Sequence, residues 1–181
     1  MHGTQLADTR DRRTKAVLTE LLASDHRQTF EFFYSGLREV ADPTVYRDEL
    51  LYNASVLAHH AQVSSHATDD LPTPSNLSDV FDAFVLNSPD DGDLLEAAGA
   101  QCLLLAGFFE EQMRRRHSIR WYAEHGADFY YRAAARQQSS EKARLLAAIS
   151  RRFEPWRQAH SQLARSLRDM PYLLRIAPPQ F

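Results

Sequence analysis

The sequence predicts an all-α protein: a single-domain bundle of six or seven helices with an apolar helix at its centre. Apolar residues recur every three or four positions in one segment after another, which is the spacing of a helix face buried in a core. The 181 residues include only 6 glycines, whereas sheet-rich folds need glycine at their many turns. With 44% apolar and 25% charged residues, the chain has the composition of an ordinary globular domain.

Three helices are expected in the N-terminal half, over about residues 4–23, 25–42 and 43–65. Pro43 fits the first turn of the third helix, because the N–H that proline lacks has no helical partner there. The apolar stripe of that helix recurs at i, i+4, i+7 and i+11: Leu50, Ala54, Leu57 and Ala61. The loop over residues 67–76, with two prolines and two acids, then separates an acidic N-terminal half from a basic C-terminal half.

A short helix near residues 78–86 is expected to precede the central helix, which spans about residues 92–116. The central helix is apolar on nearly all sides, so it should lie in the middle of the fold. Gly99 and Gly107 interrupt it at a cost of roughly 1 kcal/mol each against alanine. Glycine is tolerated best where another helix crosses closely, and both positions therefore predict such crossings.

Two further helices are expected, over about residues 119–137 and 139–170. Gly126 predicts a third close crossing. Pro155 predicts a kink or a break, because proline removes a backbone hydrogen bond and clashes with the preceding turn. We expect Trp121 and Phe129 to lie in the core. Tyr131 and Trp156 are expected to be exposed or to lie at an interface.

The lone cysteine and the hydropathy pattern predict a reduced, cytoplasmic setting without membrane contact. Cys102 cannot form an internal disulfide or a multi-thiolate zinc site, and its apolar neighbours favour a buried thiol. The N-terminal residues lack the apolar core of a signal peptide. The longest apolar stretch, Leu94 to Phe109, is shorter than the roughly 18 residues that a membrane span needs.

The net charge of −3 conceals two oppositely charged parts. Residues 1–110 hold 7 basic and 18 acidic residues, a net charge of −11. Residues 111–181 hold 14 basic and 6 acidic residues, a net charge of +8. Such a division either lets the charges pair inside the fold or attracts a charged partner.

Six arginines are the candidate contacts for such a partner, which is either a protein or an anionic ligand. They are Arg114, Arg115, Arg116, Arg120, Arg151 and Arg152. Arginine suits carboxylate pairing and aromatic stacking at protein interfaces. Nucleic-acid-binding proteins are usually basic and often lysine-rich, but the basic part of this chain contains a single lysine, Lys142. Nucleic acid is therefore the less favoured partner.

No catalytic signature accompanies these arginines. The chain contains no Gly-x-Ser-x-Gly, no HExxH, no GxGxxG and no phosphate-binding loop. No histidine follows a glutamate by three positions, the pattern of di-iron bundles. The weak candidates for a metal site are His59, Glu111, His117 and His125. We expect no cofactor, and a metalloprotein or an enzyme is the third alternative for the function.

A pattern of glycines and aromatic residues runs through residues 99–135. In its first part a helix of small residues ends in Gly-Phe-Phe, and in its second an aromatic residue and a glycine lead into Phe-Tyr. The positions that carry it are Gly99, Gly107, Phe108, Phe109, Tyr122, Gly126, Phe129 and Tyr130. This segment resembles a family of uncharacterised bacterial all-helical proteins. The resemblance implies a bacterial helical protein and no particular activity.

These features predict a non-catalytic protein-interaction module or adaptor that self-associates, most simply as a homodimer. Binding of an anionic ligand or nucleic acid through the C-terminal arginine face is the alternative. The two functions need different surfaces. An adaptor needs an exposed apolar or mixed-charge patch, whereas anion binding needs a contiguous arginine surface without carboxylates.

Overall fold

The computed structural model describes residues 26–66, 91–114 and 119–169, and every regular element in these ranges is a helix. The predicted all-α class is confirmed. The elements after a helix over residues 26–40 are α2 (Arg47–His66), α4 (Gly92–Leu103), the π-helical segment η1 (Leu104–Phe108), α5 (Glu110–Met113), α6 (Ile119–Arg136), α7 (Ser140–Arg151) and α8 (Phe153–Asp169). None of these helices is both long and apolar enough to cross a membrane.

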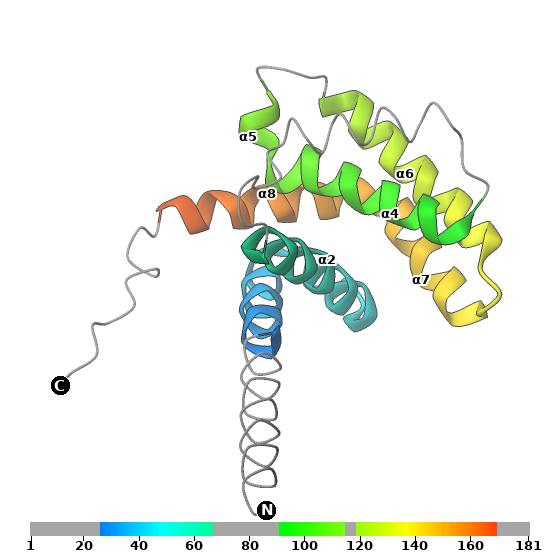
Figure 1. Ribbon diagram of the computed structural model, residues 1–181, viewed down its shortest axis with the longest axis horizontal. Coiled ribbons are helices and arrows are strands. Elements are labelled where there is room, and N and C mark those ends of the chain that lie inside the picture. Colours follow the sequence, from blue (N-terminus) through cyan, green and yellow to red (C-terminus); the bar gives the residue numbers. More distant parts are fainter. Residues whose placement is uncertain (1–25, 67–90, 115–118, 170–181) are drawn as a thin grey trace, which may run out of the picture.

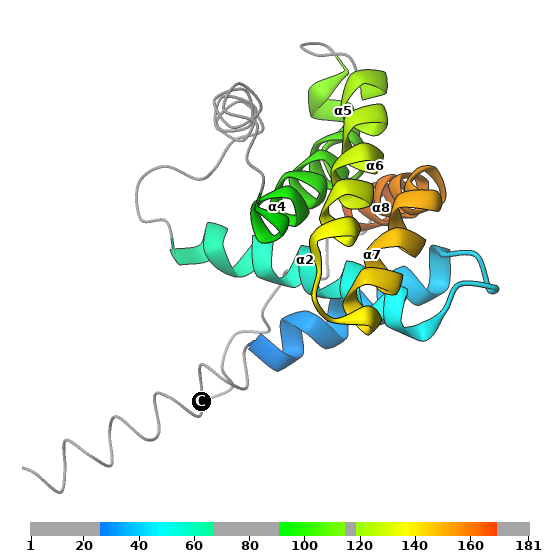
Figure 2. The ribbon, with the colours of Figure 1, turned by 90° about the vertical axis from the view of Figure 1, so that its right-hand side faces the viewer.

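The C-terminal helices pack against one another around α4 and η1. α4 packs along α6, α7 packs on α6, and η1 rests on α8 (Figure 1, Figure 2). α2 and the helix over residues 26–40 lie at one end of the bundle, and α5 lies at the other end (Figure 1). Three expected elements lie outside the described residues: helices near 4–23 and 78–86, and the loop over 67–76.

One hydrophobic core takes side chains from every described helix. Its most enclosed part belongs to α4 and η1, whose completely buried residues are Leu95, Cys102, Leu103, Leu105 and Ala106. This burial confirms the central position that the apolar sequence predicts. The residues packed around it include Tyr130, Leu146, Ile149 and Trp156.

The central helix is not continuous over residues 92–116 as expected. α4 ends at Leu103, and the backbone then widens, so that the Phe109 N–H donates to the Leu104 carbonyl at 2.9 Å, five residues earlier. A π-turn of this kind holds one residue more than an α-helical turn. The sequence could not predict the change, because residues 103–109 are all apolar or glycine and therefore conceal a shift of the buried face by one residue.

The wide turn seats Gly107 directly against α8. A β-carbon at this position would lie 2.9 Å from the His160 β-carbon and 3.0 Å from the Arg157 carbonyl oxygen. Both distances are shorter than ordinary van der Waals contact, so the two backbones approach closely only because residue 107 has no side chain. The expected crossing at Gly107 is confirmed.

Gly99 and Gly126 mark the contact between α4 and α6. A β-carbon at Gly99 would lie 2.9 Å from the Tyr130 ring, and one at Gly126 would lie 2.7 Å from the Cys102 β-carbon. The two other expected crossings are therefore confirmed as well. The sequence could not identify the partner helix in either case.

The break between α7 and α8 comes earlier than the kink expected at Pro155. α7 ends at Arg151 and α8 begins at Phe153. Pro155 therefore lies in the first turn of α8. Backbone N–H groups of the first turn have no acceptor within a helix, so the N–H that proline lacks costs no hydrogen bond there.

Phe129 and Tyr131 lie where the sequence predicts, Trp121 does so only in part, and Trp156 does not. Phe129 is buried, Tyr131 is 66% exposed, and Trp121 is partly buried at the edge of the core. Trp156, expected at the surface, is only 1% exposed. The expectation is wrong because the indole N–H finds a carboxylate partner inside the protein, that of Glu49.

We expect Gly107→Ala to lower the free energy of unfolding by roughly 1–3 kcal/mol, because the added methyl group would overlap α8. Urea denaturation followed by circular dichroism measures the change. Gly92→Ala is the matched control. Its β-carbon would lie 3.2 Å from the Arg136 β-carbon and 3.3 Å from the Gln137 side-chain nitrogen, so α4 needs to move by only a few tenths of an ångström at its first residue, and stability should change by less than ~1 kcal/mol. Equal stability of the two variants would contradict the close crossing.

Candidate functional site

Many arginines of the basic part of the sequence pair with carboxylates. In the described ranges, four of these pairs join residues one turn apart along the chain: Arg114–Glu110, Arg120–Glu124, Arg132–Asp128 and Arg157–Glu154. Five pairs join different elements among the described residues: Glu49–Arg152, Asp93–Lys142, Glu96–Lys142, Glu110–Arg157 and Glu111–Arg168. The opposite charges of the two parts of the sequence thus meet within the molecule.

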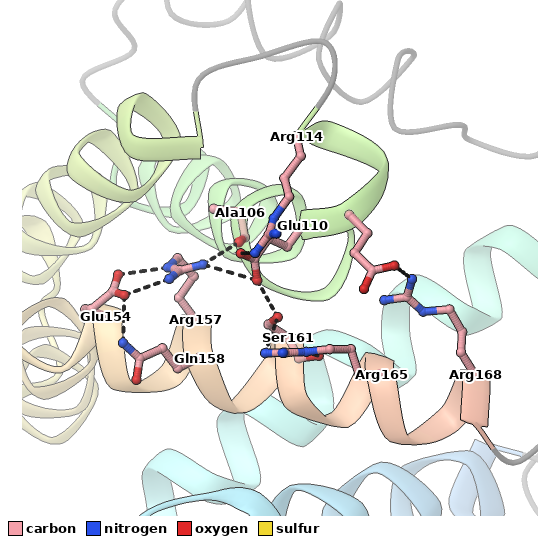
Figure 3. Close-up of polar contacts among 10 residues, drawn as sticks. Ala106, Glu110, Arg114, Glu154, Arg157, Gln158, Ser161, Arg165 and Arg168 are labelled. Carbon is pink, nitrogen blue, oxygen red and sulfur yellow. Dashed lines mark hydrogen bonds and ion pairs between the residues drawn. The ribbon is translucent and has the colours of Figure 1, made fainter.

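Arg157 on α8 holds η1 and α5 in place (Figure 3). Its guanidinium donates to both carboxylate oxygens of Glu154, at 2.7 and 2.8 Å, and to the Ala106 carbonyl of η1 at 3.1 Å. It also lies 3.5 Å from the Glu110 carboxylate, which accepts a further hydrogen bond from Ser161. The hydrogen bonds from Arg157 lower the pKa of Glu154. The charge of Arg157 is therefore satisfied by the protein itself.

The six candidate arginines do not form one basic face. Two of them already pair with an acid one turn away on the same helix, and Arg115 and Arg116 lie outside the described residues. Arg152 is half-buried against Glu49. Arg151 is exposed and makes no ion pair with any described residue. Across the ranges that the structure describes, the arginine surface is interspersed with carboxylates.

A buried carboxylate joins α2 to the α7–α8 junction. Glu49 is 1% exposed, and its carboxylate accepts hydrogen bonds from the Arg152 guanidinium and, at 2.9 Å, from the Trp156 indole. The Arg152 guanidinium also lies 5.1 Å from the centre of the Tyr46 ring, within the range of a cation–π interaction. A buried carboxylate is tolerated only when it is paired and hydrogen-bonded, and both conditions are met here.

The next turn of α2 makes a second buried contact with α8. The Asn53 side chain donates to the Glu49 carbonyl at 2.8 Å, and its oxygen lies 2.9 Å from Nε2 of His160. Because the amide oxygen can only accept, Nε2 of His160 carries the proton. Burial lowers the pKa of His160 to about 3, so the ring is neutral near pH 7. Its Nδ1 has no hydrogen-bond partner among the described residues.

Several reactive side chains are enclosed in the same way. Burial raises the pKa of the Cys102 thiol, which disfavours the nucleophilic thiolate. Burial likewise raises the pKa values of Tyr52 and Tyr130, whose hydroxyl groups lie 3.3 Å apart. Cys102 and Tyr130 are completely buried, whereas Tyr52 is partly buried at the edge of the same cluster.

The weak candidates for a metal site that the structure describes lie on different elements and do not converge on one point. His59 is exposed on α2, while Nδ1 of His125 bonds the Trp121 carbonyl at 2.8 Å. Glu111 pairs with Arg168, and His117 lies outside the described residues. Within residues 26–66, 91–114 and 119–169, no three His, Cys, Asp or Glu side chains gather closely enough to hold a metal ion.

A hollow of about 730 Å³ lies between the start of α2 and α7. We call it the α2–α7 hollow. Its apolar lining comes from α7, as Leu145, Ala147 and Ala148. Its charged lining has both signs: Asp48, Glu49, Glu141, Lys142, Arg144 and Arg151. Tyr46 at its edge is 69% exposed.

A second hollow, of about 550 Å³, lies between α6 and the α7–α8 junction. Its arginines are Arg120, Arg151 and Arg157, and its acids are Glu124 and Glu154. Arg120 and Arg157 already bind the two acids, at 2.8 and 2.7 Å. Among these five charged residues, Arg151 is therefore the one without an ion pair in the described ranges.

No family model, no curated protein and no solved structure matches this chain. The candidate site rests on the geometry of the chain itself.

The sequence did not reveal that Glu49 is buried in the core as the partner of Arg152 and Trp156. Glu49 and Asn53 lie one turn apart on α2 beside its apolar stripe, and His160 and Trp156 have the same spacing on α8. Polar residues at helical spacing on two helices were the available signal. Without knowing that α2 and α8 meet, this signal cannot be told apart from two solvated helix edges.

We expect Glu49→Gln to lower the free energy of unfolding by about 2–3 kcal/mol, because it removes a charged acceptor from Arg152 and Trp156. Urea denaturation at neutral pH is the measurement. The matched control is Glu124→Gln, which breaks an exposed pair on one helix and should cost less than ~0.5 kcal/mol. If both variants lose the same stability, the buried carboxylate is not the tie between α2 and the α7–α8 junction.

The neutral His160 should make stability fall in weak acid. The unfolded chain takes up a proton at His160 below pH 6.5, whereas the buried ring does so only near 3, so falling pH favours unfolding across this window. Within this window, the free energy of unfolding falls by up to about 1.4 kcal/mol for each unit by which the pH is lowered, through His160 alone. The stability advantage of the wild type over His160→Gln should therefore be about 2 kcal/mol smaller at about pH 5 than at about pH 7. Parallel stability–pH curves for the two proteins would argue against a buried neutral ring.

Proposed function

We propose that this chain is a non-catalytic protein-interaction module that self-associates through the α2–α7 hollow. The observation that carries the proposal is the make-up of that hollow, in which an apolar strip of α7 is flanked by exposed charges of both signs. Protein interfaces combine a small apolar centre with a polar, solvent-accessible rim in this manner. The proposal includes a bacterial, cytoplasmic setting, which the lone Cys102 and the resemblance over residues 99–135 support.

The charge pattern favours a protein over an anionic ligand. Phosphate-binding surfaces gather arginine and lysine without nearby acids, because a carboxylate repels the ligand. The α2–α7 hollow instead carries Asp48 and Glu141 together with Arg144 and Arg151. A partner that itself carries both signs of charge fits such a surface, and another protein is the simplest such partner.

Sedimentation velocity on the purified full chain tests the proposal. Between about 1 and 100 µM protein, we expect a monomer that converts to a dimer or larger species as concentration rises. The association should weaken between about 0.05 and 0.5 M salt, because exposed ion pairs are screened. Bound metal and nucleic acid are assayed on the same sample. A monomer at every concentration, or one that carries stoichiometric metal or nucleic acid, would overturn the proposal.

A further inference from the structure

We propose that the partner in the α2–α7 hollow is a second copy of this chain, with the two α7 helices packed antiparallel about a two-fold axis. This inference rests on the self-association proposed above and adds the orientation of the two copies and the residues that pair between them. In this pairing Glu141 of each copy meets Arg151 of the other.

The outward side of α7 is a continuous stripe. Its members lie at helical spacing and line the α2–α7 hollow: Glu141, Arg144, Leu145, Ala148 and Arg151. The opposite side of the same helix carries Leu146 and Ile149, which are completely buried in the core. One side of α7 thus belongs to the bundle, and the other is available to a partner.

The charges along this stripe have a direction. Glu141 lies near the start of α7 and Arg151 is its last residue, so ten residues, or about 15 Å, separate them. In an antiparallel dimer, Glu141 of each copy lies opposite Arg151 of the other, so the two-fold axis generates the same ion pair twice. A parallel copy would instead set like charges against one another, which disfavours that orientation.

These two charges have no ion pairs within the described part of the chain, in contrast to their neighbours. Lys142, next to Glu141, binds Glu96 at 2.7 Å, and Arg152, next to Arg151, binds Glu49. Both Glu141 and Arg151 are exposed. Lys142 and Arg152 thus form ion pairs inside the fold, while their neighbours Glu141 and Arg151 face outward.

The middle of the stripe allows close approach. The antiparallel pairing places its axis near residue 146, where Leu145, Ala147 and Ala148 present a small, partly buried apolar surface. Tyr46 stands beside it with 69% of its surface exposed, and aromatic residues are enriched at interfaces. A contact based on one 12-residue helix lies at the small end of known interfaces, so the dimer should dissociate in the micromolar range.

Charge exchange tests the pairing. Glu141→Arg and Arg151→Glu each convert two ion pairs into two like-charge contacts, so each variant alone should dimerise at least about tenfold more weakly than the wild type. Mixing the two variants restores both ion pairs and should give a heterodimer of nearly wild-type affinity. The double variant should recover the homodimer. Sedimentation velocity measures all four samples.

Matched controls carry the same charge changes away from the hollow. Glu39→Arg and Arg38→Glu alter exposed residues on the helix over residues 26–40, and they should leave dimerisation within about twofold of the wild type. Circular dichroism melting curves establish that all variants are folded. Since every altered residue is exposed, the melting temperatures should agree within a few degrees.

The outcomes separate this inference from the proposed function. A wild-type dimer that the single exchanges weaken and the mixture restores supports the antiparallel α7 pairing. A wild-type dimer that mixing fails to restore overturns the antiparallel pairing alone. A wild-type dimer that all the exchanges leave unchanged overturns the pairing and the α2–α7 hollow as its surface, but self-association itself stands. A wild type that stays monomeric overturns both.

Discussion

The ion pair between Glu49 and Arg152 is the interaction on which the arrangement of the helices depends. It is buried on the carboxylate side, and the Trp156 indole shares the same carboxylate, so α2 can meet the α7–α8 junction in one register only. Buried charges cost free energy when they are left without a partner, and any shift of α2 would leave one. The contact between Asn53 and His160 repeats the constraint one turn further along.

Several of the opposite charges that the sequence separates form ion pairs with one another in the folded chain. Glu96, Glu110 and Glu49 of the acidic part bind Lys142, Arg157 and Arg152 of the basic part, which brings α2, α4 and α5 onto α7 and α8. The outward side of α7 keeps a short row with an acid at one end and an arginine at the other. A strongly asymmetric sequence thus yields a surface of mixed charge, and this surface is the basis of the proposed function.

Helical spacing and the scarcity of glycine were sufficient to predict the fold class and the buried face of α2, because both are local properties. The glycine crossings were predictable for the same reason. The pairing of Glu49 with Trp156 was not, since the two residues are 107 positions apart and each helix edge looks solvated when taken alone. The π-turn was missed because it lies in a stretch that is apolar on every side, where a shift of one residue leaves no mark on the hydrophobic pattern. The α2–α7 hollow needs both the helix positions and the internal ion pairs, so sequence could not locate it.

The wide turn of η1 also sets the rotational phase of α5. It accommodates one residue more than an α-helical turn, and one residue corresponds to about 100° of rotation. Without that residue, Glu110 and Glu111 would turn away from Arg157 and Arg168, with which they now pair. Changes of length in this stretch are therefore constrained more severely than many changes of side chain, because a single deletion would misdirect two carboxylates at once.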